Sequence, residues 1–163
     1  MTKRWTMAAA LAAAGAAFAA DIPAVSIAQL ACPLRVTKVV AAYGLAGEKF
    51  KPQFYADANP DGKDLLWVAA DFENGSEDVI TGFTFEVRAW DATGTEVFNS
   101  DGIYDFAIRD KPGSKEWSWE VPGGEVVAKV IFIPRVINLP AGRTWVANEE
   151  FIAGKLADLK AGE

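Results

Sequence analysis

Short apolar and polar stretches alternate along most of the chain, separated by turn residues. The clearest alternation lies between residues 79 and 90, where four apolar residues at every second position are interleaved with Thr84, Glu86 and Arg88. Successive side chains of a strand point to opposite faces of its sheet. This segment is therefore predicted to be a strand with one face on a core and the other face in water.

The same pattern predicts a series of further strands. They cover residues 34–43, 65–72, 96–98, 103–108, 115–121 and 125–133, followed by a last hairpin of 136–139 and 144–146. Asn74-Gly75-Ser76 is expected to form a hairpin turn between its flanking strands, and residues 91–94 a second one. Pro134 should end its strand or mark an edge. About seven short strands with frequent turns predict an all-β protein, an antiparallel β-sandwich spanning 34–148.

The C-terminal tail, residues 149–163, has a different spacing. Phe151, Ile152, Leu156 and Leu159 recur at the period of a helix. We expect a short helix that packs on the sandwich, or a tail that frays.

The first twenty residues resemble a secretory signal peptide in composition. Lys3 and Arg4 precede an apolar run at 8–20, which contains the small-x-small triplet 17–19. Residues 1–19 are therefore predicted to be a signal peptide that is cleaved before Ala20, leaving an N-terminal extension of 20–33. The mature protein is expected in the periplasm or outside the cell. No later segment reaches the length of a bilayer span, so no transmembrane segment is expected after cleavage.

Charge and composition exclude several classes of partner and of catalyst. The net charge is −6, and removal of Lys3 and Arg4 leaves 14 basic residues against 22 acidic ones, a net charge of −8. Such a surface repels phosphate backbones, so we expect no nucleic-acid partner. The chain contains no histidine, and both methionines precede the predicted cleavage point. Zinc hydrolases, copper carriers and Ser-His or Cys-His catalysts need those groups, so these classes are excluded. A protein that is not an enzyme and has no cofactor is favoured, and an enzyme that uses only carboxylates, with two acids converging in a pocket, is the alternative.

Cys32 is the only cysteine, so it cannot form a disulfide within the chain. A small apolar residue at the edge of the fold is the favoured interpretation, with an intermolecular disulfide as the alternative. Lipid attachment needs Leu-small-small before the cysteine, whereas this chain has Gln29-Leu30-Ala31. Lipidation of Cys32 is therefore not predicted.

Residues 57–64 have the spacing of a calcium loop. Asp57, Asn59 and Asp61, followed by Gly62, match the Asp-x-Asn-x-Asp-Gly start of such loops. The twelfth position should carry an acidic bidentate ligand, but it is Val68. A solvated turn is therefore favoured, with a calcium site as the alternative.

Trp117 and Trp119 point to the same side of a predicted strand. On an exposed face, two parallel indoles would stack on a sugar or bind a peptide. The row continues at Val121, which is typical of the core side of a strand. The core position is favoured, and a binding site is the alternative.

Residues 74–94 resemble part of a known family. Asn74-Gly75-Ser76, and the strand ending Val87-Arg88-Ala89-Trp90-Asp91 before a glycine turn, are similar to the bacterial extracytoplasmic immunoglobulin-like domains of the FxLYD type. Val87, Ala89 and Trp90 stand where that motif has Phe, Leu and Tyr, and its Asp is matched by Asp91. The resemblance extends over about residues 65–146. It implies an immunoglobulin-like sandwich in which Trp90 closes the core edge and Asp91 caps the turn.

The resemblance also implies an exported binding or accessory module without catalytic residues. We therefore expect a non-catalytic module acting through contacts with another envelope or secreted protein. A small-ligand module that binds carbohydrate or calcium is the alternative.

Overall fold

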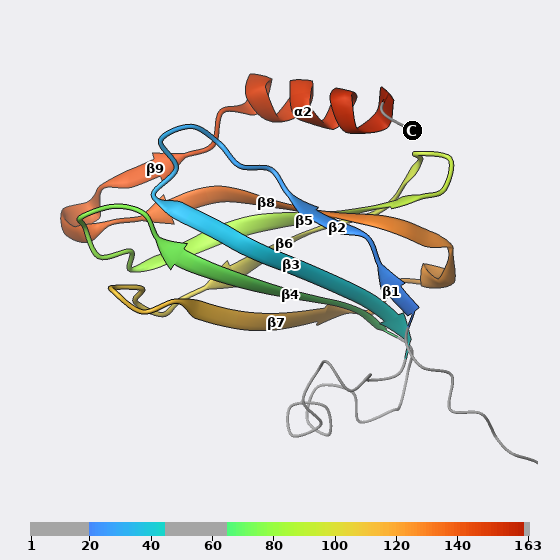
Figure 1. Cartoon of the computed structure of the whole chain (residues 1–163), viewed down its shortest axis with the longest axis horizontal. Helices are drawn as coiled ribbons and strands as arrows, with labels where there is room; N and C mark the ends of the chain where they lie inside the picture. The colour runs from blue at the N-terminus through green and yellow to red at the C-terminus, as the bar shows by residue number, and fades with distance from the viewer. Residues whose placement is uncertain (1–19, 45–64, 162–163) are drawn as a thin grey trace, which may run out of the picture.

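The computed structural model describes residues 20–44 and 65–161, which form two facing β-sheets and one α-helix outside them (Figure 1). Sheet A contains, in spatial order, β1 (Ala20–Ile22), β3 (Leu34–Gly44), β4 (Leu65–Asn74) and β7 (Gly113–Trp119). Sheet B contains β2 (Ala24–Ser26), β8 (Val127–Asn138), β5 (Gly82–Asp91) and β6 (Glu96–Tyr104), and β9 (Thr144–Val146) pairs with the end of β8. The predicted all-β sandwich is confirmed.

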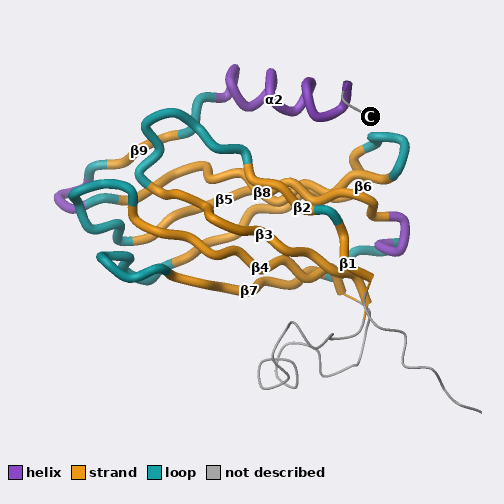
Figure 2. The backbone as a smooth tube through the Cα atoms, in the orientation of Figure 1, coloured by secondary structure: helices purple, strands orange, loops and turns teal. Residues whose placement is uncertain are grey.

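The chain passes repeatedly from one sheet to the other (Figure 2). β3 and β4 pair in sheet A, β5 and β6 form a hairpin in sheet B, β7 returns beside β4, and β8 returns beside β5. These returns, of β7 beside β4 and of β8 beside β5, join the two sheets into a mainly antiparallel β-sandwich. β1 and β2 act as one N-terminal strand that changes sheets at Pro23, and β2 runs parallel to β8. Residues predicted as an N-terminal extension thus contribute to both sheets.

The main core lies between the sheets and follows the predicted alternation. Phe83, Phe85, Val87 and Ala89 of β5 all point inward and are fully buried. The ring of Phe85 stacks on that of Phe132, with ring centres 4.5 Å apart. The inner face of β5 is therefore predicted correctly by its period-two pattern.

The outer face of β5 is not the water-facing surface that the sequence predicts. The helix α2 (Glu149–Ala161) covers part of sheet B and buries Ile152 against Trp90 and Ile131. Trp90 therefore lies beneath α2 rather than at the edge of the main core, which corrects the role implied by the resemblance. Glu86, also on this face, is almost fully buried. The predicted C-terminal helix is confirmed, and it packs on the sandwich.

The Asn74 turn forms, but it does not produce the predicted hairpin. Asn74 Oδ1 accepts the Ser76 backbone N–H at 2.9 Å, and Asn74 Nδ2 donates to the carbonyls of Asp78 and Ile108. Ile108 belongs to the connection between β6 and β7. The turn therefore leads the chain from sheet A to sheet B, because local turn chemistry reverses the chain without fixing which sheet the next strand joins.

β8 continues past Pro134, so of the two predicted alternatives the strand end is wrong. Pro134 lies where the register between β5 and β8 shifts, so its missing N–H falls at an irregularity of the ladder. Gln29 Nε2 donates to the Pro134 carbonyl at 3.1 Å, and Gln29 Oε1 accepts the Asn148 N–H at 2.9 Å. This side chain bridges the gap between β2 and β9 along β8.

The segments predicted as two strands, 96–98 and 103–108, contribute to a single strand, β6, that ends at Tyr104.

The turn between β5 and β6 forms as predicted, with Asp91 as its first residue. Asp91 Oδ1 accepts hydrogen bonds from the Thr93 hydroxyl at 2.7 Å, the Thr93 N–H at 2.8 Å and the Thr95 N–H at 3.0 Å. These bonds, with the Thr93 hydroxyl first, lower the pKa of Asp91 below its ordinary value of 3.8.

Replacing Asp91 with asparagine is expected to destabilise the protein in a pH-dependent way. Because the pKa is lower in the folded than in the unfolded state, the charged Asp91 stabilises the fold above the ordinary pKa of 3.8. That contribution is lost as pH falls through the folded value. Urea midpoints of the wild type and Asp91→Asn, measured between about pH 2 and pH 6, should converge at the acid end. A difference that is constant with pH would contradict this account.

Candidate functional site at the loop end

Four connections gather at one end of the sandwich, which we call the loop end: residues 27–33, 75–81, 105–112 and 139–143 (Figure 1). The registers place Leu34 opposite Asn74, and Tyr104 opposite Phe83. Ile80 and Ile108, from two of these loops, exchange both backbone hydrogen bonds, at 3.1 and 2.8 Å. This cross-connection ties the loops of the two sheets together.

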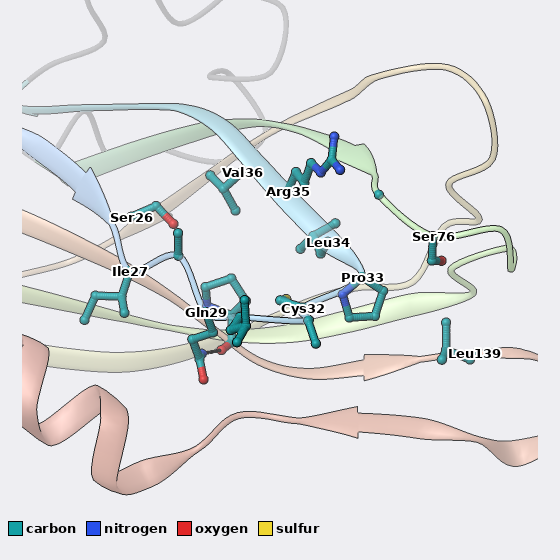
Figure 3. A pocket seen from close by; sticks show the side chains of 15 residues that line it. Ser26, Ile27, Gln29, Cys32, Pro33, Leu34, Arg35, Val36, Ser76 and Leu139 are labelled. Carbon is teal, nitrogen blue, oxygen red and sulfur yellow. Dashed lines mark hydrogen bonds between the residues drawn. The ribbon is translucent and has the colours of Figure 1, made fainter.

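A cavity of about 560 Å³ opens at the loop end beside Cys32. Figure 3 shows its lining, which comes from the β2–β3 loop, the start of β3, Ser76 and Leu139. Cys32 is half-buried, and this burial raises the pKa of its thiol, although a backbone hydrogen bond at Leu34 opposes the shift. A thiol with a raised pKa stays protonated at neutral pH and is a weak nucleophile. This arrangement suits the binding of an apolar group better than covalent chemistry.

A second, smaller hollow of about 160 Å³ is bordered by an exposed apolar surface. Leu30 is 96% exposed, Val146 is 62% exposed and Phe151 is 37% exposed, and Trp145 of β9, which is half-buried, also lines the hollow. We call these four residues the Leu30 patch. Apolar side chains grouped in this way on a surface are typical of a contact with another molecule.

The backbone holds Leu30 outward through a strained turn. The Cys32 N–H donates to the Gln29 carbonyl at 3.2 Å, so Leu30 and Ala31 are the central residues of a four-residue turn. Ala31 has φ 59°, a left-handed conformation that costs a non-glycine residue about 1–2 kcal/mol. The hydrogen bonds of the Gln29 side chain anchor the turn to β8 and to Asn148. Strain that the surrounding structure maintains is concentrated at functional sites.

Trp117 and Trp119 lie on the inner face of β7, where they pack against the main core. The ring centres of Trp117 and Phe85 are 4.4 Å apart, and those of Trp119 and Phe98 are 6.0 Å apart. Both indoles thus occupy the core side that the sequence favours. A ligand site at Trp117 and Trp119 stays a prediction.

The calcium hypothesis also stays a prediction, because Asp57, Asn59 and Asp61 lie outside the described residues. Within 20–44 and 65–161, no three acidic or cysteine side chains are grouped closely enough to hold a metal ion. α2 falls short of the length and apolar character that a membrane span requires, and the described residues contain no other candidate.

Reasoning from sequence missed the Leu30 patch. A single leucine in a short loop has no periodic signal, and its exposure follows from the turn that Ala31 closes. The only available sign was an apolar residue between Gln29 and Cys32 in a segment without strand alternation. Val146 and Phe151 were assigned to a hairpin and a helix, and no pattern indicated that they would meet Leu30.

Comparison with known proteins identifies no relative. No family model, curated protein or solved structure matches the chain. The function therefore has to be argued from the geometry of the loop end and of the sheet edges.

Proposed function

We propose that this protein is an exported, non-catalytic module that binds another protein of the cell envelope through the Leu30 patch. The observation that carries the proposal is Leu30, held almost completely in water by a strained turn beside Val146 and Phe151. Burying one such side chain contributes about 1.5–3 kcal/mol, so a leucine kept exposed at a cost in backbone strain suits a contact with a partner.

The start of the fold supports the export part of the proposal. β1 begins at Ala20, the residue predicted to follow signal-peptide cleavage, and Ala20 pairs with Tyr43 of β3. Cleavage before Ala20 would leave all the strands of the described residues intact. The position of the predicted cleavage is therefore compatible with the folded domain.

The Leu30 patch is testable by replacing Leu30 with aspartate. A buried charge opposite an apolar partner surface should weaken binding by at least about tenfold, the range expected of a central contact residue. The measurement is capture of cross-linked partners from the cell envelope, followed by dissociation constants of the recovered protein. Partner recovery that is equal for the wild type and Leu30→Asp would overturn the proposal.

Two variants serve as controls for that experiment. Val126→Asp places the same charge on an exposed valine in the short helical turn η2 (Gly124–Val126), away from the patch, and should bind normally. Ala31→Gly relaxes the positive φ while retaining Leu30, so it should stabilise the fold and keep binding. Together they separate loss of the leucine from a general effect of charge or of loop geometry.

The Cys32 cavity favours a second candidate, a module for a small apolar ligand. Its volume of about 560 Å³ lies in the range of ligand sites, and Leu34, Pro134 and Leu139 contribute to an apolar wall. Leu30 also lines this cavity, so Leu139 is the better residue to change: a larger side chain such as tryptophan at 139 would fill the cavity while leaving Leu30, Val146 and Phe151 in place. A partner that binds Leu139→Trp but not Leu30→Asp would favour the protein-binding function over this candidate.

A further inference from the structure

Among the strands that the structure describes, β6 forms one edge of sheet B and pairs with β5 alone. The hydrogen-bond pattern of the sheet identifies the β6 backbone groups that point away from β5. On the far side of the sheet, the Val130 N–H donates to the Pro23 carbonyl at 2.9 Å, and the Phe132 carbonyl accepts the Ile27 N–H at 3.0 Å. These even-numbered residues of β8 are therefore directed toward β2. The odd-numbered residues of β8, 131 and 133, therefore form their backbone hydrogen bonds with β5.

The alternation then continues across β5 into β6. Residues 131 and 133 of β8 face Arg88 and Glu86, so these even-numbered β5 residues bond to β8. The odd-numbered β5 residues bond to β6, at positions 100 and 102. The β6 residues in between direct their backbone N–H and C=O groups away from the sheet: Asn99, Asp101 and Ile103.

A separate contact supports this assignment. The indole nitrogen of Trp117, on the facing sheet, donates to the Ile103 carbonyl at 3.4 Å. That carbonyl must point away from β5 to accept this bond. Within the part of the chain that the structure describes, no strand pairs with the outward side of Asn99 and Asp101. The Asp101 carbonyl accepts a hydrogen bond from the Ser100 hydroxyl at 3.3 Å, and a carbonyl has room for a second one. A row of backbone donors and acceptors that no strand pairs with is a template for an added strand.

Acidic and basic side chains form a chain of ion pairs on the outer face near this edge. Glu86 lies between two arginines, with Oε1 2.5 Å from Arg88 Nε and Oε2 3.1 Å from Arg135 Nε. Arg88 and Arg135 each contact one further carboxylate, those of Glu96 at 3.1 Å and Glu149 at 3.0 Å. Two guanidinium groups thus form ion pairs with three carboxylates.

Asp101 adds a fourth carboxylate to this group. It lies directly opposite Glu86 on the outer face, in a pair without mutual hydrogen bonds, where side chains approach most closely. Among the described residues, no cation contacts Asp101. A positive charge supplied by an added strand, opposite Asp101, would give this carboxylate a cationic partner.

This charge argues against a second copy of the chain as the added strand. A symmetric pairing of two β6 edges about Asp101 would place the two aspartates opposite each other, which is destabilising. Ile103, 61% exposed two residues further along the same face, instead offers an apolar position next to the negative one. The surface therefore fits a strand that carries a cation and an apolar residue at that spacing.

We propose that β6 binds an extended segment of the partner protein as an added strand, with Lys or Arg opposite Asp101 and an apolar residue opposite Ile103. This inference rests on the proposed function and names the kind of segment that the partner supplies. Main-chain hydrogen bonds would give affinity, and the alternate side chains would give specificity.

The test uses the full mature chain and a synthetic peptide of about nine residues, alternating Val and Thr around one central Lys. NMR-detected hydrogen exchange should show new protection at the amides of Asn99, Asp101 and Ile103. The amides of residues 100 and 102 already bond to β5 and should not change. Uniform protection, or none at millimolar peptide, would overturn the inference.

Charge reversal tests the register. Asp101→Lys should bind the lysine peptide about tenfold more weakly, because an attraction is replaced by a repulsion, and should prefer the same peptide with Glu at its centre. Equal binding of both peptides by the wild type would overturn the assigned charge complementarity.

Backbone variants at Asn99 separate strand addition from side-chain contact. Asn99→Pro removes one outward N–H and should weaken peptide binding while β6 stays paired with β5, because proline is tolerated on edge strands. Asn99→Ala keeps the N–H and should bind normally. Leu30→Asp should leave peptide binding unchanged, so failure of the peptide experiment and failure of the Leu30 patch are distinguishable.

Discussion

Replacing Arg135 with methionine is expected to lower the free energy of unfolding by about 3–5 kcal/mol, as when one partner of a buried ion pair is removed. The side chain of Glu86 is only 5% exposed, and it depends on Arg88 and Arg135 for its ion pairs. Without Arg135, the carboxylate keeps a single cationic partner and cannot reach water. Methionine preserves the apolar stem of arginine, so the loss reports mainly on charge.

Removing Glu86 should cost less than removing Arg135. The side chains of Arg88 and Arg135 are 26% and 24% exposed, and each retains a second carboxylate when Glu86 is replaced by glutamine. We expect a loss of about 1–3 kcal/mol for Glu86→Gln, measured from urea unfolding midpoints beside Arg135→Met. The double variant Glu86→Leu with Arg135→Met should recover much of the loss, because an apolar pair replaces a broken ionic one. The opposite order of the two single variants would contradict this account.

The buried Glu86 also shows the limit of reading faces from a sequence. The alternation along 79–90 distinguishes the two faces of β5 correctly, because the strand period is a local property of the backbone. What covers the second face depends on α2, which follows it by some sixty residues along the chain. Glu86 and Trp90 were therefore expected in water and at the core edge, and both lie buried on the outer face of sheet B.

Strand pairing shows the same difference: a turn depends on neighbouring residues, whereas the pairing of two strands depends on residues far apart in the sequence. Asp91 to Gly94 was predicted as a hairpin turn, and it joins two strands that pair. Asn74 has equally strong turn chemistry, yet its two flanking strands belong to different sheets. β4 pairs with β7, and β5 pairs with β8, across long stretches of chain that no turn residue can encode.

The candidate site was the least predictable part. Leu30, Val146 and Phe151 come from a loop, a strand and a helix, and only the packed fold brings them together. The tryptophans that stood out in the sequence instead support the core. Chemically prominent residues were thus easier to find than an exposed apolar surface made of ordinary ones.

Replacing Phe85 with alanine is expected to lower the free energy of unfolding by about 3–5 kcal/mol, because it empties the centre of the main core. The ring of Phe85 stacks on Phe132 and lies 4.4 Å from Trp117, measured between ring centres. It also covers Gly102, the residue directly opposite on β6, where an added Cβ would overlap the end of the ring. An aromatic side chain that shields an edge-strand glycine in this way fixes the register of the pair.

Gly102→Ala should consequently destabilise the wild type by about 1–3 kcal/mol, since the ring is held by its neighbours and cannot withdraw. Phe85→Leu removes the atoms that the new methyl group would strike, so Gly102→Ala should cost much less in that background. Urea unfolding of the two single variants and the double variant forms a thermodynamic cycle that isolates the contact. Additive losses would mean that Phe85 does not occupy the space above Gly102. A strongly non-additive result would confirm the register of β6 against β5, on which the outward direction of Asn99, Asp101 and Ile103 depends.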